Sequence, residues 1–390
     1  AGQLDRLPYY STFRGTSNDV VIELAEELRK FFEPDGLVRA FFTSGGSDSV
    51  ETALRLSRQY HKIRGEAGRV KFLSLKKGYH GTHFGGASVN GNANFRTMYE
   101  PLLPGCHHIP APFPYRNPFN ETDPARLAQL CLQALEDEIA FQGAGTIAAF
   151  IMEPILGAGG VIPPHPSFMP GVAAICRKNG ILLIADEVIT AFGRTGAWTG
   201  SRLWGVQPDF ACTAKAITNA YFPFGAVMIA EGVAEVFESD ESGKAAIGHG
   251  YTYSGHPVSC AAGLKNIEIL QREDLLANAA KVGAYFQTRM KALESLPLVG
   301  NVRGKGLMLC VENVADKARK TLLPDAVNES KRISDVAEQL GLIVRPIGHL
   351  NVMSPPLIIT EADVDFIADT LHQAIRRVSD DLIREGIKLG

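Results

Sequence analysis

Ile181-Leu182-Leu183-Ile184-Ala185-Asp186-Glu187-Val188 begins with five apolar residues, and two acidic residues, Asp186 and Glu187, follow them directly. An apolar run this short is typical of a strand buried in a parallel sheet. A carboxylate at the carboxyl end of such a strand lies where open α/β sheets bind their ligands. We therefore expect Asp186 to be buried next to a positive group.

A lysine among small and apolar residues is the second unusual feature. Lys215 stands in the run Thr213-Ala214-Lys215-Ala216-Ile217-Thr218-Asn219. Lysine is almost never fully buried unless it is paired or used covalently. A Schiff base between Lys215 and a bound cofactor, with Asp186 facing the same cofactor, would explain both residues.

The composition is that of a globular enzyme. Of the 390 residues, 45% are hydrophobic and 21% are charged, and the net charge of -3 gives no reason to expect binding to nucleic acid or to an anionic membrane. No run approaches the roughly 20 apolar residues of a membrane span. The six cysteines are scattered without a CxxC pair, which indicates reduced thiols. We expect a soluble, cytoplasmic protein that acts on small molecules.

The pattern along the chain predicts an α/β fold with two domains. Between residues 41 and 264, short apolar runs at 70–75, 148–152, 181–185 and 226–229 alternate with helical patterns. This rhythm is typical of a doubly wound, mostly parallel sheet. Long helices and a strand at 341–346 then predict a smaller α+β domain. We assign residues 1–36 to the N-terminal part of the small domain, 37–267 to the large domain, and 268–390 to the C-terminal small domain.

A glycine-rich turn, Ser44-Gly45-Gly46-Ser47-Asp48, joins the strand ending at Phe42 to a helix. Backbone N–H groups at a helix N-terminus attract anions, and paired glycines let the chain pass close to a phosphate. Gly46 and Ser47 are therefore candidate phosphate ligands. An ordinary glycine-rich turn with a helix cap explains the same residues.

Two further motifs follow predicted strands. In Gly78-Tyr79-His80-Gly81, the ring of Tyr79 or His80 could stack on a flat cofactor. Glu153 ends an apolar run, where burial would be costly without a hydrogen-bonding partner. A half-buried tyrosine, a surface histidine and a satisfied structural glutamate are the alternatives.

Two candidates lie later in the chain. Thr252, in Thr252-Tyr253-Ser254-Gly255-His256-Pro257, precedes a predicted helix and could make a second phosphate contact. Arg345 ends the predicted strand at 341–346, where its guanidinium could grip a carboxylate through two hydrogen bonds. A polar loop and a surface arginine are the alternatives.

Competing chemistries lack their motifs. Gly304-Lys305-Gly306 carries only part of a dinucleotide-binding pattern, and the GxxxxGK[ST], HExxH and GxSxG motifs are absent from the sequence. His107-His108 has no second cluster of metal-ligand residues nearby in the sequence. We expect no metal site.

Taken in order, the motifs resemble those of class III aminotransferases. The resemblance is closest to the amine:pyruvate, or ω-transaminase, branch of these fold type I pyridoxal-phosphate enzymes. It rests on Ser44-Gly45-Gly46-Ser47, Gly78-Tyr79-His80-Gly81, Glu153-Pro154, Asp186-Glu187-Val188-Ile189, Phe192-Gly193-Arg194-Thr195-Gly196, Lys215, Thr252-Tyr253-Ser254-Gly255-His256-Pro257 and Arg345-Pro346. Family members usually have Gly-Ser-Gly-Ser-Glu where this chain has Ser44-Gly45-Gly46-Ser47-Asp48, which moves one glycine.

The resemblance implies pyridoxal 5'-phosphate as the cofactor and a role for each candidate. Lys215 would form the Schiff base, Asp186 would pair with the pyridine nitrogen, and Tyr79 and Val188 would cover the two ring faces. The remaining cofactor-binding residues would be Gly46 and Ser47 at the phosphate, with His80 and Glu153 nearby. Thr252 would reach the phosphate of a neighbouring subunit, which implies a homodimer with shared active sites, alone or paired into a tetramer. Arg345 would be a mobile arginine that binds the acceptor's carboxylate.

The resemblance also implies the reaction. The enzyme would move an amino group from a primary amine or ω-amino acid to a 2-oxo acid such as pyruvate, alternating between the pyridoxal and pyridoxamine forms of the cofactor. The alternative is another class III reaction, such as amination of 8-amino-7-oxononanoate or an intramolecular amino shift. A cofactor-binding protein without turnover is a third hypothesis, against which both Lys215 and Asp186 argue.

Overall fold

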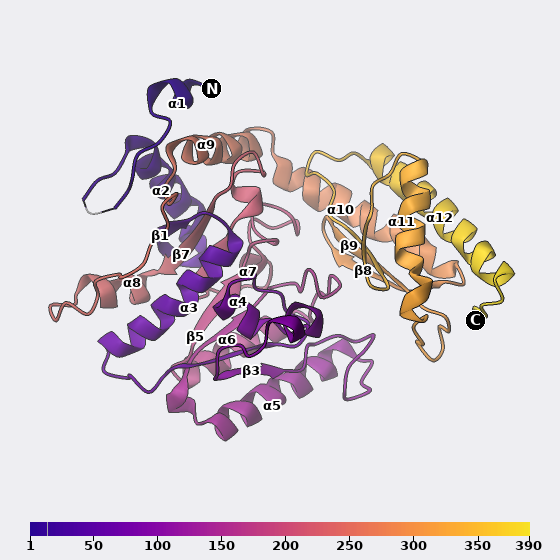
Figure 1. Cartoon of the computed structure of the whole chain (residues 1–390), viewed down its shortest axis with the longest axis horizontal. Coiled ribbons are helices and arrows are strands. Elements are labelled where there is room, and N and C mark those ends of the chain that lie inside the picture. Colours follow the sequence, from indigo (N-terminus) through magenta and orange to yellow (C-terminus); the bar gives the residue numbers. More distant parts are fainter. Residues whose placement is uncertain (14) are drawn as a thin grey trace. The chain divides into compact units, whose positions relative to one another are not determined.

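The computed structural model describes residues 1–13 and 15–390, and the chain forms two compact units (Figure 1). The larger unit contains Ala1–Gly159, Pro164–Phe192 and Thr199–Glu273. The smaller unit contains Gly160–Pro163, Gly193–Trp198 and Asp274–Gly390. Each unit has its own sheet and is described by itself.

The larger unit is built on a seven-stranded sheet in the order β1-β7-β6-β5-β4-β2-β3. Its strands are β1 (Leu37–Thr43), β2 (Lys71–Leu75), β3 (Cys106–Ile109), β4 (Ile147–Met152), β5 (Leu182–Asp186), β6 (Phe210–Thr213) and β7 (Gly225–Ala230). Neighbouring strands from β6 to β3 are parallel, and only β7 runs antiparallel to its neighbours. The predicted mostly parallel α/β sheet is confirmed.

Helices precede, connect and follow these strands. They are α1 (Gly2–Arg6), α2 (Asp19–Phe32), α3 (Gly46–Ile63), α4 (Phe84–Val89), α5 (Pro124–Gln142), α6 (Phe168–Lys178), α7 (Gly200–Leu203), α8 (Glu231–Glu238) and α9 (Pro257–Arg272). Apolar residues of α3, including Val50 and Leu54, pack on buried strand residues such as Ile151 and Ile184. Among the described residues of both units, no helix is long and apolar enough to cross a membrane.

The strand register brings four loops to one edge of the sheet. Met152 pairs with Ala185 across β4 and β5, and Asp186 pairs with Cys212 across β5 and β6. Because these strands are parallel, the residues that follow each of them emerge at the same edge. The loops after β2, β4, β5 and β6 therefore meet there, and they carry most of the predicted site.

Residues 1–36, which we expected in the smaller domain, belong to the larger unit. The apolar stripe of α2, spaced like one face of a helix, is buried at Val20, Leu24 and Leu28. This helix packs against α9 and β1, and a Cβ placed on Gly263 of α9 would lie 3.3 Å from a methyl group of Leu24. The amphipathic pattern predicted the helix, but an apolar stripe on a helix does not show against which sheet the helix packs.

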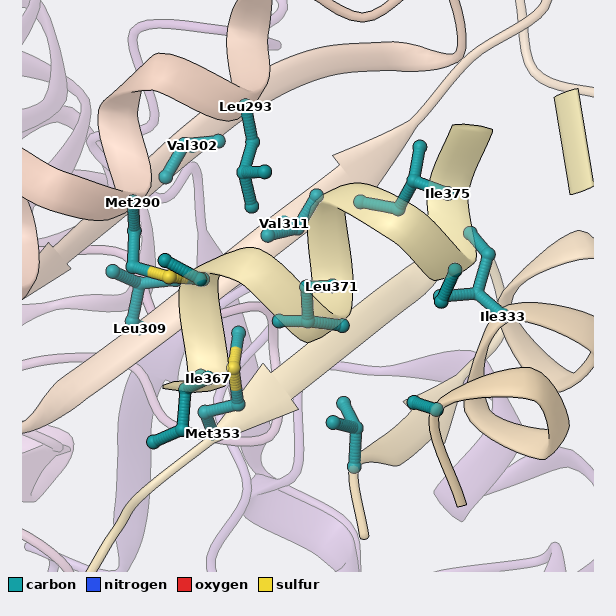
Figure 2. Packing of buried hydrophobic residues seen from close by; sticks show 14 of the residues in the cluster. Met290, Leu293, Val302, Leu309, Val311, Ile333, Met353, Ile367, Leu371 and Ile375 are labelled. Atoms are coloured by element: carbon teal, nitrogen blue, oxygen red, sulfur yellow. The ribbon is translucent and has the colours of Figure 1, made fainter. Parts of the chain in front are cut away.

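The smaller unit has a four-stranded antiparallel sheet in the order β10-β11-β9-β8. Its elements are α10 (Leu275–Lys291), β8 (Val299–Lys305), β9 (Met308–Asn313), α11 (Glu329–Gln339), β10 (Arg345–Ile347), β11 (Leu350–Met353) and α12 (Glu361–Arg384). Figure 2 shows Ile367, Leu371 and Ile375, one face of α12, packed with Leu309 and Val311 of β9. This cluster forms the core of the unit.

The strand expected at 341–346 is largely wrong. Only Arg345 and Pro346 of that range belong to β10, because the preceding residues close the end of α11. The N–H groups of Gly341 and Leu342 donate to the carbonyls of Glu338 and Ala337. These bonds complete the helix terminus before the chain becomes extended.

Candidate active site

A cavity lies at the carboxyl edge of the large sheet. Open α/β sheets bind their ligands at this edge. Eight of the ten predicted site residues line the cavity, together with Val50, Gly81 and Ile189: Gly46, Ser47, Tyr79, His80, Glu153, Asp186, Val188 and Lys215. Of the four loops at this edge, those after β4, β5 and β6 carry a catalytic candidate or a buried carboxylate.

Asp186 is the last residue of β5 and is only 5% exposed. Its Oδ2 lies 2.9 Å from Nδ1 of His80, and its Oδ1 accepts a hydrogen bond from the backbone N–H of Val188 at 3.2 Å. Hydrogen bonds to a carboxylate favour its charged form. Carboxylate oxygens have further lone pairs, so Asp186 can accept one more donor, such as a protonated ring nitrogen.

His80 is held from two sides. Its backbone N–H donates to Oδ1 of Asn90, while Nδ2 of Asn90 donates to the carbonyl of Gly81 at 3.0 Å. The His80 ring is buried, and its Nε2 has no hydrogen-bond partner among the described residues. The sequence analysis missed Asn90, because a lone asparagine between Val89 and Gly91 gives no local signal of a contact ten residues away.

Glu153 ties the loop after β4 to the loop after β2. Its Oε1 accepts from the backbone N–H of Tyr79 at 2.9 Å, and its Oε2 accepts from the N–H of Gly157 at 2.7 Å. Burial raises the pKa of Glu153 to about 7, and the charge of Asp186 adds to that rise. The charge of His80 and the two amide hydrogen bonds oppose the rise in pKa.

The N-terminus of α3 provides an anion site. The cap residue Gly45 has no side chain to accept the first N–H groups of the helix, so the N-terminus at Gly46 and Ser47 can bind an anion. Oγ of Ser47 accepts from the backbone N–H of Thr82 at 3.1 Å. Gly81 has a φ of +100°, and a Cβ there would lie 2.7 Å from Oγ of Ser47, so this close approach requires glycine.

Lys215 follows β6 and begins the 3-10 helix Lys215–Ile217. Its φ of 44° is a left-handed conformation that is uncommon for residues other than glycine and is often found at functional sites. The side chain lines the cavity but is exposed in the single chain, which corrects the expectation of a buried lysine. Oγ of Ser49 donates to the carbonyl of Thr213 at 3.1 Å, which fixes the chain just before Lys215.

The remaining lining residues supply apolar walls. Tyr79 is half-buried, and its ring lies 4.8 Å from that of Phe95 at an angle of 63°. A Cβ on Gly46 would lie 3.1 Å from Cγ1 of Val188, so a larger residue at position 46 would crowd this wall. An aromatic ring and a branched aliphatic side chain are suitable surfaces for a flat ligand.

This set of groups fits pyridoxal phosphate, the cofactor that the resemblance implies. The N-terminus of α3 suits the phosphate, the amine of Lys215 suits the aldehyde carbon, and the buried Asp186 suits the ring nitrogen. Tyr79 and Val188 suit the ring faces. All of these groups line one cavity.

Two predicted site residues are not part of this cavity lining. Thr252 is exposed in the loop before α9, where its carbonyl accepts from the hydroxyl of Tyr9 at 2.8 Å. Arg345 is exposed at the start of β10 in the smaller unit. Their roles in the site remain predictions.

Glu187 is a structural residue of the site to which the sequence analysis gave no role. The carboxylate is 1% exposed, and burial raises its pKa. It accepts hydrogen bonds from Oγ1 of Thr190, from the N–H of Gly200, and from both the N–H and Oγ of Ser201. Glu187 therefore closes the chain after β5 onto the start of α7. The sequence feature that could have identified Glu187 was a second carboxylate at the end of a buried strand.

A second hollow lies at the opposite edge of the sheet, near the starts of β5 and β6. Its lining includes His61, Asp209 and Arg177. His61 is already bonded to Glu66 and to the carbonyl of Ala148. No lysine is among the described residues of this lining, so the carboxyl-edge cavity is the better candidate for cofactor chemistry.

Replacing Gly81 with alanine should weaken cofactor binding. The new Cβ would push on Ser47 from 2.7 Å at a backbone φ that alanine rarely adopts. We expect a loss of about 1–3 kcal/mol, roughly 5- to 150-fold in the Kd of pyridoxal phosphate, measured by absorbance titration. Gly145→Ala is the control, because no heavy atom lies within 4 Å of a Cβ there. Equal affinities for both variants would contradict the tight contact at Gly81.

Glu153 should make stability fall as the pH rises towards neutrality. A carboxyl group with a pKa of about 7 when folded, against 4.5 as its ordinary value, binds more protons in the folded state. Stability should therefore fall between about pH 4.5 and 7 and change no further above. In the protein without cofactor, Tm of Glu153→Gln should lack this part of the pH dependence. Glu23→Gln, at an exposed site, is the control and should keep this pH dependence. Parallel pH profiles of Tm for the parent protein, Glu153→Gln and Glu23→Gln would refute the raised pKa of Glu153.

Comparison with known sequences identifies the family. The aminotransferase class-III pattern matches residues 3–375. The diaminobutyrate–2-oxoglutarate transaminase of Halomonas elongata is 38% identical over 385 residues, which cover 97% of this chain and 82% of the relative. The chain is therefore similar to established transaminases over nearly its whole length.

Solved structures agree with the sequence match. An amine transaminase from an uncultivated Pseudomonas species, in its pyridoxal-phosphate-bound form, is 47% identical with a TM-score of 0.95 and covers 97% of this chain and 85% of its own. An (S)-enantioselective ω-transaminase from Thermomicrobium roseum is 42% identical with a TM-score of 0.93, over 97% of this chain and 83% of its own. Together with the site, these matches show that the chain belongs to the class III aminotransferases, which are pyridoxal-phosphate-dependent enzymes of fold type I.

Proposed function

We propose that this aminotransferase moves an amino group from a primary amine or ω-amino acid to a 2-oxo acid such as pyruvate. The observation that carries the proposal is that Lys215, Asp186, Tyr79 and the N-terminus of α3 line one cavity. The similarity to amine and ω-transaminases of known structure, at 47% and 42% identity, supports the choice of donor class.

Bound pyridoxal phosphate supplies an electron sink and a carrier for the amino group. Lys215 would first hold the cofactor through Nζ, then be released by the incoming amine and remain beside the reacting carbon. Its Nζ would take the proton from that carbon and return it to the cofactor. A positioned base of this kind contributes on the order of 10²–10⁴ in rate.

Asp186 would keep a proton on the ring nitrogen of the cofactor. Its carboxylate is buried and is oriented by the contact of Oδ2 with Nδ1 of His80. Glu153 would act indirectly, because it holds the backbone of Tyr79 in the loop after β2. These residues would orient the ring while Lys215 moves the proton.

Arg345 would bind the carboxylate of the acceptor. The side chain is exposed, and Arg345 makes no ion pair within residues 1–13 and 15–390. A site that accepts a neutral amine and then an acid cannot keep an unpaired cation buried at low cost. An arginine that reaches in only when a carboxylate is bound would meet both demands.

An absorbance experiment tests this function. The purified protein with pyridoxal phosphate should show the visible band of the lysine-bound cofactor, lose it on addition of a simple primary amine, and regain it with pyruvate. A band absent from the parent protein even with added cofactor, or equally strong in the parent and Lys215→Ala proteins, would refute the assignment of Lys215.

The acceptor can be chosen in the same experiment. The Halomonas relative is named for 2-oxoglutarate, so 2-oxoglutarate is added in place of pyruvate to a second sample. Recovery of the band with 2-oxoglutarate alone would keep the aminotransferase reaction but overturn the amine:pyruvate assignment.

We also propose a homodimer in which Thr252 completes the partner's phosphate site. Thr252 is exposed and stands beside an exposed aromatic patch formed by Tyr9, Phe13 and Tyr253. Tyr9 and Tyr253 pack edge to face at 6.1 Å, and a Cβ on Gly250 would touch the ring of Phe13. Exposed patches rich in aromatic side chains are typical of protein interfaces.

Mixed subunits test the shared site. Lys215→Ala and Thr252→Asp should each be nearly inactive, the second because a carboxylate repels phosphate. Co-expression of the two variants should restore activity, since each mixed dimer would hold one site with both residues intact. Activity no greater than the sum of the two variants would show that Thr252 serves no neighbouring site.

A further inference from the structure

The hairpin that carries Arg345 is a short edge element of the small sheet. Its strands β10 and β11 pair at only three positions, from Arg345 with Val352 to Ile347 with Leu350. β10 has a neighbour on one side only. An edge strand with so few partners needs other contacts to hold its direction.

The tip of this hairpin is fastened by its backbone. Gly348 and His349 form the two-residue turn, and Gly348 takes the left-handed φ of 56° that such a turn requires. Oγ of Ser330, in the first turn of α11, donates to the carbonyl of Gly348. The carbonyl of His349 accepts from the N–H of Asn313 at 2.9 Å and from its Nδ2 at 3.2 Å. The tip is thus bound to both α11 and β9.

The side chain of His349 makes a further clamp. Its Nδ1 lies 2.9 Å from Oε1 of Glu329, and its Nε2 lies 3.3 Å from Oδ1 of Asp325. Carboxylate oxygens accept hydrogen bonds, so Nδ1 of His349 is the donor to Glu329. The ring therefore stands between the buried carboxylate of Glu329 and the exposed carboxylate of Asp325.

Glu329 makes this clamp costly to lose. Its side chain is fully buried, and its Oε2 has no hydrogen-bond partner among the described residues. A buried carboxylate without a partner is strongly destabilised. Loss of the His349 ring would leave Glu329 without its hydrogen-bond donor, so we expect the tip to shift.

Arg345 lies at the other end of the hairpin, so its position depends on that of the tip. Pro346 follows Arg345 and restricts its backbone to extended conformations. Val344, just before, is buried in the core cluster. The backbone at Arg345 is therefore set by the hairpin, while its exposed side chain remains able to rotate.

We propose that His349, through its hydrogen bond with Glu329, is a positioning residue for Arg345 and thereby sets the affinity for the 2-oxo acid acceptor. The proposal rests on the proposed binding of the acceptor's carboxylate by Arg345. It assigns the two half-reactions different sensitivities when the donor is a simple amine, because such an amine, unlike the acceptor, carries no carboxylate into the site.

The test compares KM for pyruvate with KM for a simple amine in His349→Leu and His349→Asn. Leucine removes both donors, whereas Nδ2 of asparagine can replace Nδ1 as the donor to Glu329. We expect His349→Leu to raise KM for pyruvate roughly 5- to 50-fold with little change for the amine, and His349→Asn to recover most of the loss. His372→Leu, the same change at an exposed site on α12, is the control.

Arg345→Ala and the double variant show whether the effect passes through Arg345. If His349 acts through Arg345, His349→Leu should add nothing to KM for pyruvate once Arg345 is alanine. An additive effect, or an equal change in both KM values, would mean that His349 only stabilises the fold and would overturn the proposal.

Two other outcomes are also decisive. If Arg345→Ala leaves KM for pyruvate unchanged, the binding role of Arg345 is refuted and this proposal falls with it. If Arg345→Ala raises that KM but folded His349→Leu does not, only the positioning role is refuted. Should His349→Leu fail to fold, Glu329→Gln replaces it, with the same selective rise in KM expected and its absence overturning the proposal.

Discussion

The buried carboxylate of Asp186 is the constraint around which the carboxyl edge of the large sheet is arranged. At 5% exposure it needs hydrogen-bond donors, which are Nδ1 of His80 at 2.9 Å and the backbone N–H of Val188 at 3.2 Å. His80 in turn is held by Asn90. Each group in this chain of contacts satisfies the next, so the loops after β2 and β5 cannot move independently.

Two further buried carboxylates also hold loops in place, by accepting hydrogen bonds from backbone N–H groups. Glu153 binds the amides of Tyr79 and Gly157, and Glu187 binds the amides of Gly200 and Ser201. Irregular loops leave N–H groups that must find acceptors when they are buried. Glutamate side chains at the ends of the central strands provide these acceptors and give the loops one conformation. The left-handed backbone of Lys215 is tolerated within this rigid frame.

The two units contribute different chemistry. Every residue that lines the cofactor cavity belongs to the larger unit, and this cavity contains the features that relate the chain to other class III aminotransferases. The smaller unit carries Arg345 on a hairpin whose tip is fixed by the hydrogen bond between His349 and Glu329.

The sequence by itself determined the mostly parallel sheet, the strand that ends at Asp186, the family and eight residues of the cavity, because alternating apolar runs and ordered motifs are local properties of the chain. Tertiary structure alone decided which of these groups form hydrogen bonds with one another. The contacts of His80 with Asp186 and of Tyr79 with Glu153 join residues 106 and 74 positions apart. They depend on strand order and register, which periodicity does not report. For the same reason the sequence did not show that residues 1–36 pack in the larger unit, that Lys215 is exposed, or that Asn90 and Glu187 hold the loops of the site.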